Sequence, residues 1–175
     1  MEFGSCGPSK ETCVARQSEV KEILMDILNN SIERAQAKWK IVCNSDICAG
    51  CRICEVVCSL YKEGVVNPEL SRIQVVKSPL DGYISEAKIC KQCPDPECLA
   101  VCPTQALYID GVTGARVIDA KKCTGCKLCI EACIGTPKRI RYNSEKKVCI
   151  KCDLCAGNPQ CVRFCPQGAL QYIKS

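Results

Sequence analysis

Cysteine is the residue type through which this chain can do chemistry, since 20 of its 175 residues are cysteine and none is histidine. Sixteen of the cysteines fall into four runs with short, repeating gaps. The runs are Cys48, Cys51, Cys54 and Cys58; Cys90, Cys93, Cys98 and Cys102; Cys123, Cys126, Cys129 and Cys133; and Cys152, Cys155, Cys161 and Cys165. The first and third read C-x2-C-x2-C-x3-C, and the second and fourth are wider variants that each end in Cys-Pro.

The spacing of these runs is typical of [4Fe–4S] ligands. In C-x2-C-x2-C the chain wraps so that three thiolates face one iron–sulfur cube, and the next cysteine sits a helical turn away. The alternative is a non-redox zinc-binding module, but zinc ribbons pair two separated C-x2-C knuckles without a third cysteine at a fixed gap. The four runs therefore predict four [4Fe–4S] clusters, with all sixteen cysteines as iron ligands.

The absence of histidine excludes several kinds of site. No Ser-His-Asp or Cys-His catalytic unit, histidine-ligated zinc, Rieske centre or histidine-ligated haem can form. No glycine-rich nucleotide-binding motif is present either. We expect a non-catalytic chain that carries single electrons. An iron–sulfur sensor usually lacks one ligand so that its cluster is labile, and here no ligand is missing.

Charge and hydropathy give expectations about location and partners. No apolar run approaches the roughly 18 residues of a membrane span, and no secretion signal is visible, so a cytoplasmic protein is expected. In a reducing compartment, clustered cysteines indicate metal rather than disulfides. The formal charge of +5 neglects the clusters. Each cluster with its thiolates carries −2, so four bring the total to about −3, which removes the argument for nucleic acid.

The elements that must position these cysteines form two regions. Residues 1–40 are predicted to be an N-terminal extension, and 41–175 a cluster domain. The extension carries apolar residues at helical spacing, which predicts an amphipathic helix over 14–39. The residues are Val20, Ile23, Leu24, Ile27, Leu28, Ile32, Ala35 and Trp39. This helix either packs on its own domain or docks a partner subunit.

Beyond Cys43 no helical period is visible, and short strands alternate with the cysteine runs. Strands are predicted over 106–109 and 115–118, joined by the turn residues of Asp110-Gly111 and Thr113-Gly114. Another strand is expected over 72–76, followed by a turn at 79–82, and a last one over 168–173. The fold class is therefore α+β, with short hairpins and short helices around the clusters.

Residues 44–174 resemble the four-cluster, ferredoxin-like electron-transfer subunits of anaerobic oxidoreductases. The segments Cys-Ala-Gly-Cys-Arg-Ile-Cys-Glu-Val-Val-Cys, Cys-Lys-Gln-Cys-Pro-Asp-Pro-Glu-Cys-Leu-Ala-Val-Cys-Pro and Lys-Cys-Asp-Leu-Cys carry the resemblance. Such subunits partner molybdenum- or tungsten-pterin enzymes, hydrogenases, formate dehydrogenases or carbon monoxide dehydrogenases. The segment 58–73 is most similar to the small subunits of tungsten aldehyde oxidoreductase-type enzymes, including tungsten benzoyl-CoA reductases. A catalytic partner subunit, a second redox partner and a hetero-oligomer are implied.

The resemblance also implies that two ferredoxin-like units are nested. An inner unit, about 86–145, contains the second and third runs, and the first and fourth runs close around it. The last cysteine of each run then ligates the cluster of the paired run. The implied ligand sets are Cys48, Cys51, Cys54 and Cys165; Cys152, Cys155, Cys161 and Cys58; Cys90, Cys93, Cys98 and Cys133; and Cys123, Cys126, Cys129 and Cys102.

Four cysteines, Cys6, Cys13, Cys43 and Cys149, fall outside the runs. They are read as buried or incidental thiols rather than ligands of a fifth cluster. Cys149 is an alternative ligand to Cys152, although Cys152 aligns better with the second run. Basic residues also gather between 121 and 151, either as a solvated rim or as a docking face for an acidic redox partner.

Overall fold

The computed structural model describes residues 38–78 and 84–175. The chain divides into the units Met1–Ala35 and Gln36–Ser175, and only the second contains described residues. The predicted helix over 14–39 thus lies almost wholly outside the described part. Its last position is wrong, because Trp39 begins strand β1 (Trp39–Cys43) and stacks on Tyr172 with ring centroids 4.8 Å apart. Pairing with a distant strand overrides the local helical spacing there.

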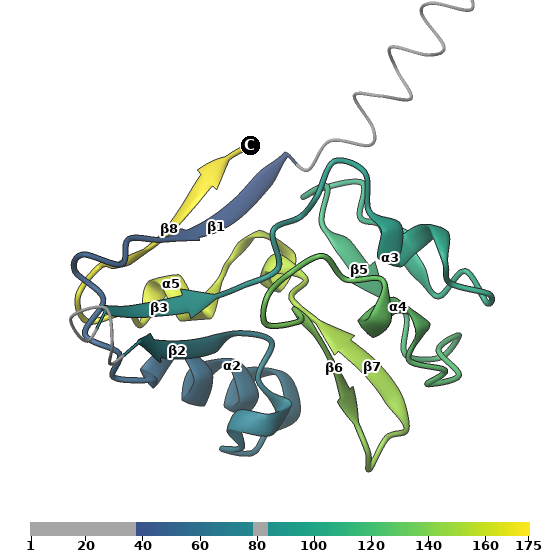
Figure 1. Ribbon diagram of the computed structural model, residues 1–175, viewed down its shortest axis with the longest axis horizontal. Coiled ribbons are helices and arrows are strands. Elements are labelled where there is room, and N and C mark those ends of the chain that lie inside the picture. Colours follow the sequence, from purple (N-terminus) through teal and green to yellow (C-terminus); the bar gives the residue numbers. More distant parts are fainter. Residues whose placement is uncertain (1–37, 79–83) are drawn as a thin grey trace, which may run out of the picture. The chain divides into compact units, whose positions relative to one another are not determined.

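The strands form four two-stranded antiparallel sheets in the described part of the chain (Figure 1). The pairs are β1 with β8 (Leu170–Lys174), β2 (Gln74–Ser78) with β3 (Ile84–Lys88), β4 (Leu107–Ile109) with β5 (Arg116–Ile118), and β6 (Ile140–Asn143) with β7 (Val148–Lys151). The predicted strands over 106–109, 115–118 and 168–173 are found as β4, β5 and β8, with starts one, one and two residues later than expected. Strand β2 also starts two residues later than expected, and the predicted turn at 79–82 lies outside the described residues.

Short helices follow or contain the cysteine runs. They are α2 (Ile53–Glu63), α3 (Glu97–Ala100), α4 (Leu128–Glu131) and α5 (Gln160–Arg163), with 3-10 turns η1 (Pro68–Leu70) and η2 (Leu154–Gly157). Helix α2 packs against α5, and α3 against α4. None of the described helices is long and apolar enough to cross a bilayer.

Helix α2 is one of the short helices expected around the clusters, although no helical period is visible in its segment. Its buried residues are Cys54, Glu55 and Ser59, so the inward face has no apolar period that could reveal it. The Glu55 carboxylate accepts a hydrogen bond from the backbone N–H of Val75 at 2.6 Å and pairs with Arg52 at 2.9 Å. A satisfied carboxylate thus replaces an apolar side chain at the packing surface.

Candidate iron–sulfur sites

Three cavities in the described part of the chain are each lined by four cysteines from two different runs. We number the sites from 1 to 4, starting with the one that contains the first three cysteines of the first run. Site 1 contains Cys48, Cys51, Cys54 and Cys165; site 2 contains Cys58, Cys152, Cys155 and Cys161; site 3 contains Cys90, Cys93, Cys98 and Cys133. The fold therefore brings together the thiols of three of the four ligand sets that the resemblance implies.

The remaining set, Cys102, Cys123, Cys126 and Cys129, is called site 4. Cys129 is buried in an apolar cluster with Leu107 and Ile140, against which Cys102 and Cys123 pack. Cys126 is exposed. No three of the described His, Cys, Asp or Glu side chains converge on the position of a single metal ion. The thiols of sites 1 to 3 instead stand around cavities.

The backbone at the first and third runs is shaped to approach an anionic group. Gly50 and Arg52 have φ of 63° and 65°, and Gly125 and Lys127 have φ of 69° and 66°. Left-handed residues can turn neighbouring backbone N–H groups toward one concave side, as in many phosphate and Fe–S sites. Glycine adopts this conformation without a steric penalty, which explains Gly immediately before Cys51 and Cys126.

Burial opposes ionisation of the thiols in these sites. It raises the pKa of Cys54 to about 12 and also raises the pKa of Cys129, Cys152 and Cys161, with neighbouring cysteines adding to the shift. Because only the thiolate ligates metal, these crowded thiols need a cationic partner to lose their protons. Iron bound among these thiols would supply that charge.

Cys102 differs from these buried thiols. Burial opposes its ionisation, but the backbone N–H of Leu107, the Thr104 hydroxyl and further backbone N–H groups lower its pKa overall. Backbone N–H groups also donate to the sulfurs of Cys58, Cys123 and Cys133, each at 3.4 Å. Such donors stabilise thiolate charge and are a common means of tuning Fe–S sites.

Site 3 is lined by three buried cations. Arg116 is fully buried, Lys151 is 5% exposed and Arg139 is 9% exposed. Burial lowers the pKa of both arginines, and the neighbouring cysteines act in the opposite direction. The Nε and Nη1 atoms of Arg139 are buried without a hydrogen-bond partner among the described residues. Cationic N–H donors beside four thiols fit a [4Fe–4S] cluster, whose net charge is −2 and whose sulfurs accept hydrogen bonds.

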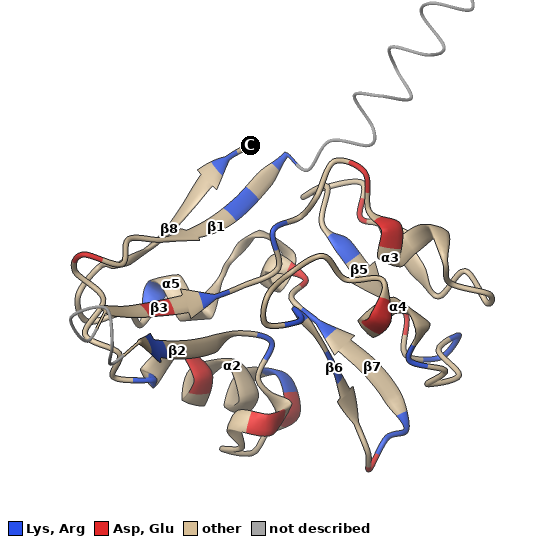
Figure 2. Ribbon diagram, in the orientation of Figure 1, with Lys and Arg blue, Asp and Glu red and all other residues tan. Residues whose placement is uncertain are grey.

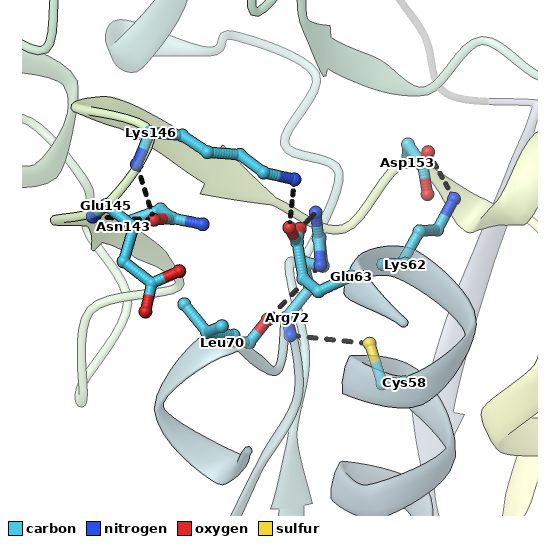
Figure 3. Close-up of polar contacts among 9 residues, drawn as sticks. All are labelled: Cys58, Lys62, Glu63, Leu70, Arg72, Asn143, Glu145, Lys146 and Asp153. Carbon is cyan, nitrogen blue, oxygen red and sulfur yellow. Dashed lines mark hydrogen bonds and ion pairs between the residues drawn. The ribbon is translucent and has the colours of Figure 1, made fainter. Parts of the chain in front are cut away.

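Site 2 contains cations of a different kind, each held by a carboxylate (Figure 3). Lys62 Nζ lies 2.6 Å from Asp153 Oδ2, and Arg72 pairs with Glu63, which also binds Lys146 Nζ at 2.5 Å. The backbone N–H of Arg72 is the group that donates to Cys58 Sγ. Each cation next to site 2 therefore contacts a carboxylate, and Glu63 is shared by Arg72 and Lys146.

The two described cysteines outside the runs lie beside ligand sets. Cys43 Sγ accepts the backbone N–H of Ala87 at 3.3 Å, and Cys48 lies next to it and helps burial to raise its pKa to about 11. Cys149 is 2% exposed and interacts with Cys123 and Cys129, whereas Cys152 lines the cavity of site 2 and Cys149 does not. Its spacing in the sequence gave no signal for this contact, which depends on the unpredicted β6–β7 hairpin.

Comparison with known proteins identifies iron–sulfur relatives. The family model for a 4Fe–4S dicluster domain matches residues 82–175. The polyferredoxin-like subunit of an aliphatic sulfonate oxidoreductase from Pyrococcus furiosus is 43% identical over 142 residues, which are 81% of this chain and 80% of that protein. A putative electron transport protein, YsaA, from Escherichia coli K12 is 36% identical over 76% of this chain and 88% of its own length.

Two further similarities are more limited. The beta subunit of an NADH-dependent phenylglyoxylate dehydrogenase from Aromatoleum evansii is 39% identical over 72% of this chain, which spans only 28% of that protein. The active site complex BamBC of benzoyl coenzyme A reductase, solved with benzoyl-CoA, aligns with a TM-score of 0.45 and 26% identity over 78% of this chain and 80% of that one.

Proposed function

We propose that this chain, which belongs to the 4Fe–4S dicluster family, relays single electrons through four [4Fe–4S] clusters to or from a catalytic oxidoreductase subunit. The sixteen cysteines of sites 1 to 4 are the proposed ligands. A cluster bound there supplies one-electron redox chemistry, and the chain supplies spacing, burial and charge. The observation that carries the proposal is that three cavities are lined by four cysteines each, every set drawn from two runs.

Shared elements connect neighbouring sites in a linear order. Helix α2 carries Cys54 of site 1 and Cys58 of site 2. Between sites 2 and 3, Gln92 donates to the backbone carbonyl of Cys152 at 3.2 Å, and Cys90 adds to the burial that raises the pKa of Cys152. Sites 3 and 4 share α3 and α4, which pack together. We propose that electrons pass along this order.

The two ends of this path reach the surface. Cys51 of site 1 and Cys126 of site 4 are exposed, whereas the cysteines of sites 2 and 3 are buried or half-buried. Around Cys51 the exposed side chains include Ile47 and Ile53, which suit a lasting apolar contact. We propose that the catalytic subunit docks at this end.

Lysines surround the other end of the path. Figure 2 shows basic segments before α4 and at the turn between β6 and β7. The loop that contains Cys126 is flanked by the exposed side chains of Lys121, Lys122 and Lys127. The β6–β7 turn lies against this loop, because a Cβ on Gly125 would collide with the backbone carbonyl oxygen of Lys147. This lysine face complements an acidic carrier, and long-range attraction speeds the encounter of redox partners. We propose that the second redox partner is acidic and docks here.

For the catalytic subunit we propose a tungsten- or molybdenum-pterin enzyme of the aldehyde oxidoreductase or benzoyl-CoA reductase type. Its support is the sequence resemblance of 58–73, together with a relative that is itself a subunit of a sulfonate oxidoreductase. A hydrogenase, formate dehydrogenase or carbon monoxide dehydrogenase is the alternative. Anaerobic co-purification followed by tungsten, molybdenum and nickel analysis distinguishes these partners.

The function is tested by measuring iron, zinc and acid-labile sulfide in anaerobically purified protein. Four clusters predict about sixteen iron and sixteen sulfide per chain; zinc without sulfide would overturn the proposal. Cys133→Ser tests the ligand sets, because it should disturb the cluster of Cys90, Cys93 and Cys98 rather than that of its own run. Cys102→Ser should give the reciprocal result at site 4.

The lysine face is tested with the double variant Lys121→Glu/Lys122→Glu. Its second-order rate of reduction by an acidic ferredoxin should fall at least tenfold at low salt and approach the wild-type rate at high salt. Arg163→Glu, an exposed basic position at the end of α5, is the control. Equal losses in the two proteins would contradict docking at site 4.

A further inference from the structure

We infer that the cluster at site 3 has the highest reduction potential of the four, set by the buried cations Arg139 and Lys151. Electrons entering from either end would then collect at site 3 before moving on. This inference rests on the proposed function, since it needs clusters at the four sites.

Both cations line the cavity and are buried, whereas Lys91 of the same cavity is exposed. The Arg139 Nη2 atom donates to the neutral backbone carbonyl of Thr136 at 3.1 Å. The Nε and Nη1 atoms of Arg139 have no hydrogen-bond partner among the described residues. The bond to Thr136 holds the guanidinium group and leaves its charge in place.

Carboxylates near site 3 compensate this charge only in part. Asp95 and Glu97 line the same cavity, and both are exposed to solvent, where their fields are screened. Glu86 acts on Arg139, but Glu86 is itself ion-paired with Lys88. A net positive charge therefore remains in the buried wall.

The consequence for the cluster follows from charge. A [4Fe–4S] cluster with four thiolates goes from −2 to −3 when it is reduced, so a nearby cation stabilises the reduced form more than the oxidised one. The interaction is strongest where water is excluded. Among the described residues, the other sites lack a buried cation without a carboxylate partner. The cations of site 2 are paired with carboxylates, and Arg52 at site 1 is paired with Glu55. Lys127 at site 4 is exposed to solvent.

The test is an anaerobic redox titration of the full chain, followed by electron paramagnetic resonance. Lys151→Met and Arg139→Met should each lower the highest potential, so that the reduced-to-oxidised ratio of that cluster falls at least tenfold at a fixed potential, about 59 mV for one electron. Arg139→Lys should restore most of the shift, because it keeps the charge. Lys91→Met, on the exposed rim of the same cavity, is the matched control and should change the ratio less than threefold.

Assignment of the signal uses Cys93→Ser, which should alter the same highest-potential signal because Cys93 lines only site 3. A shift in a different signal, or no shift in Lys151→Met at full iron content, would overturn the inference. If Arg139→Met loses iron, Lys151→Met decides the outcome. Absence of iron and sulfide from the wild-type protein would instead refute the proposed function.

Discussion

Sites 2 and 3 are neighbours with the same number of cysteines, and they differ in how their cations are balanced. Beside site 2, Lys62 pairs with Asp153, and Arg72 pairs with Glu63 (Figure 3). In the wall of site 3, the Arg139 side chain donates to the backbone carbonyl of Thr136. Under the proposed assignment, two sites with the same number of cysteines should therefore differ in redox behaviour, because the surrounding charges are set separately from the ligands.

Removal of iron should have the largest effect and should separate the two sites. We expect a chelator under reducing anaerobic conditions to unfold the cluster domain, because the energy of ligand binding is part of its folding energy. The region around site 3 should unfold first, since removal of the cluster leaves its buried cations without an anionic partner. Hydrogen exchange should show α3 and α4 losing protection before α2. A cooperative fold that persists without iron, or uniform loss of protection, would contradict this.

Glu63→Gln should make site 2 resemble site 3. It removes the carboxylate shared by Arg72 and Lys146, which should cost roughly 3 kcal/mol of unfolding free energy and raise the potential of the site 2 cluster. Thermal unfolding followed by visible circular dichroism and a redox titration measure the two effects. Glu145→Gln, an exposed position on the β6–β7 turn, is the control.

The stabilisation that the Glu63 carboxylate provides depends on pH. Burial opposes ionisation of Glu63, but Lys146 and Arg72 lower its pKa below the ordinary 4.5. The stabilisation is therefore present above pH 4.5 and is lost as the pH falls through the lowered pKa. The difference in melting temperature between wild type and Glu63→Gln should be constant near neutral pH and shrink on acidification below 4.5. A difference that grows on acidification would contradict it.

Gly135→Ala should lower the reduction potential of the site 3 cluster, because it displaces the Arg139 side chain. The new Cβ would lie 2.6 Å from Arg139 Cγ and 3.2 Å from the carbonyl oxygen of Pro137, so the arginine side chain must move. We expect a loss of about 1–3 kcal/mol in stability and a lower potential for the site 3 cluster. Gly111→Ala, which enters open space, is the control. An unchanged potential would show that the position of Arg139 is not critical.

Cys149→Ala should have the smallest effect. Cys149 touches the site 4 thiols but is not a proposed ligand, so iron content should stay the same and stability should fall by about 1 kcal/mol. Cys102→Ala is the comparison and should lose the site 4 cluster. The opposite pattern, with iron lost only from Cys149→Ala, would make Cys149 the ligand.

Local elements were predictable where the signal lies within a few residues. The turn residues between 110 and 114 indicated the β4–β5 hairpin correctly. Helix α2 was missed because Glu55 and Ser59 face inward. The β6–β7 hairpin was missed although a signal exists: Asn143 Oδ1 accepts the N–H groups of Glu145 and Lys146, each at 3.0 Å, which is the turn chemistry of asparagine.

The kind of chemistry could be predicted from cysteine spacing alone, because spacing is a local property of the chain. The charges around each site depend on contacts between residues far apart in the sequence. Arg72 and Arg139 look alike in the sequence, yet Arg72 meets Glu63 and Arg139 enters the wall of site 3. Lys146 reaches Glu63 across 83 positions of sequence. Electrostatic fields act through space and depend on burial, so only the folded arrangement fixes which cations remain to act on a cluster.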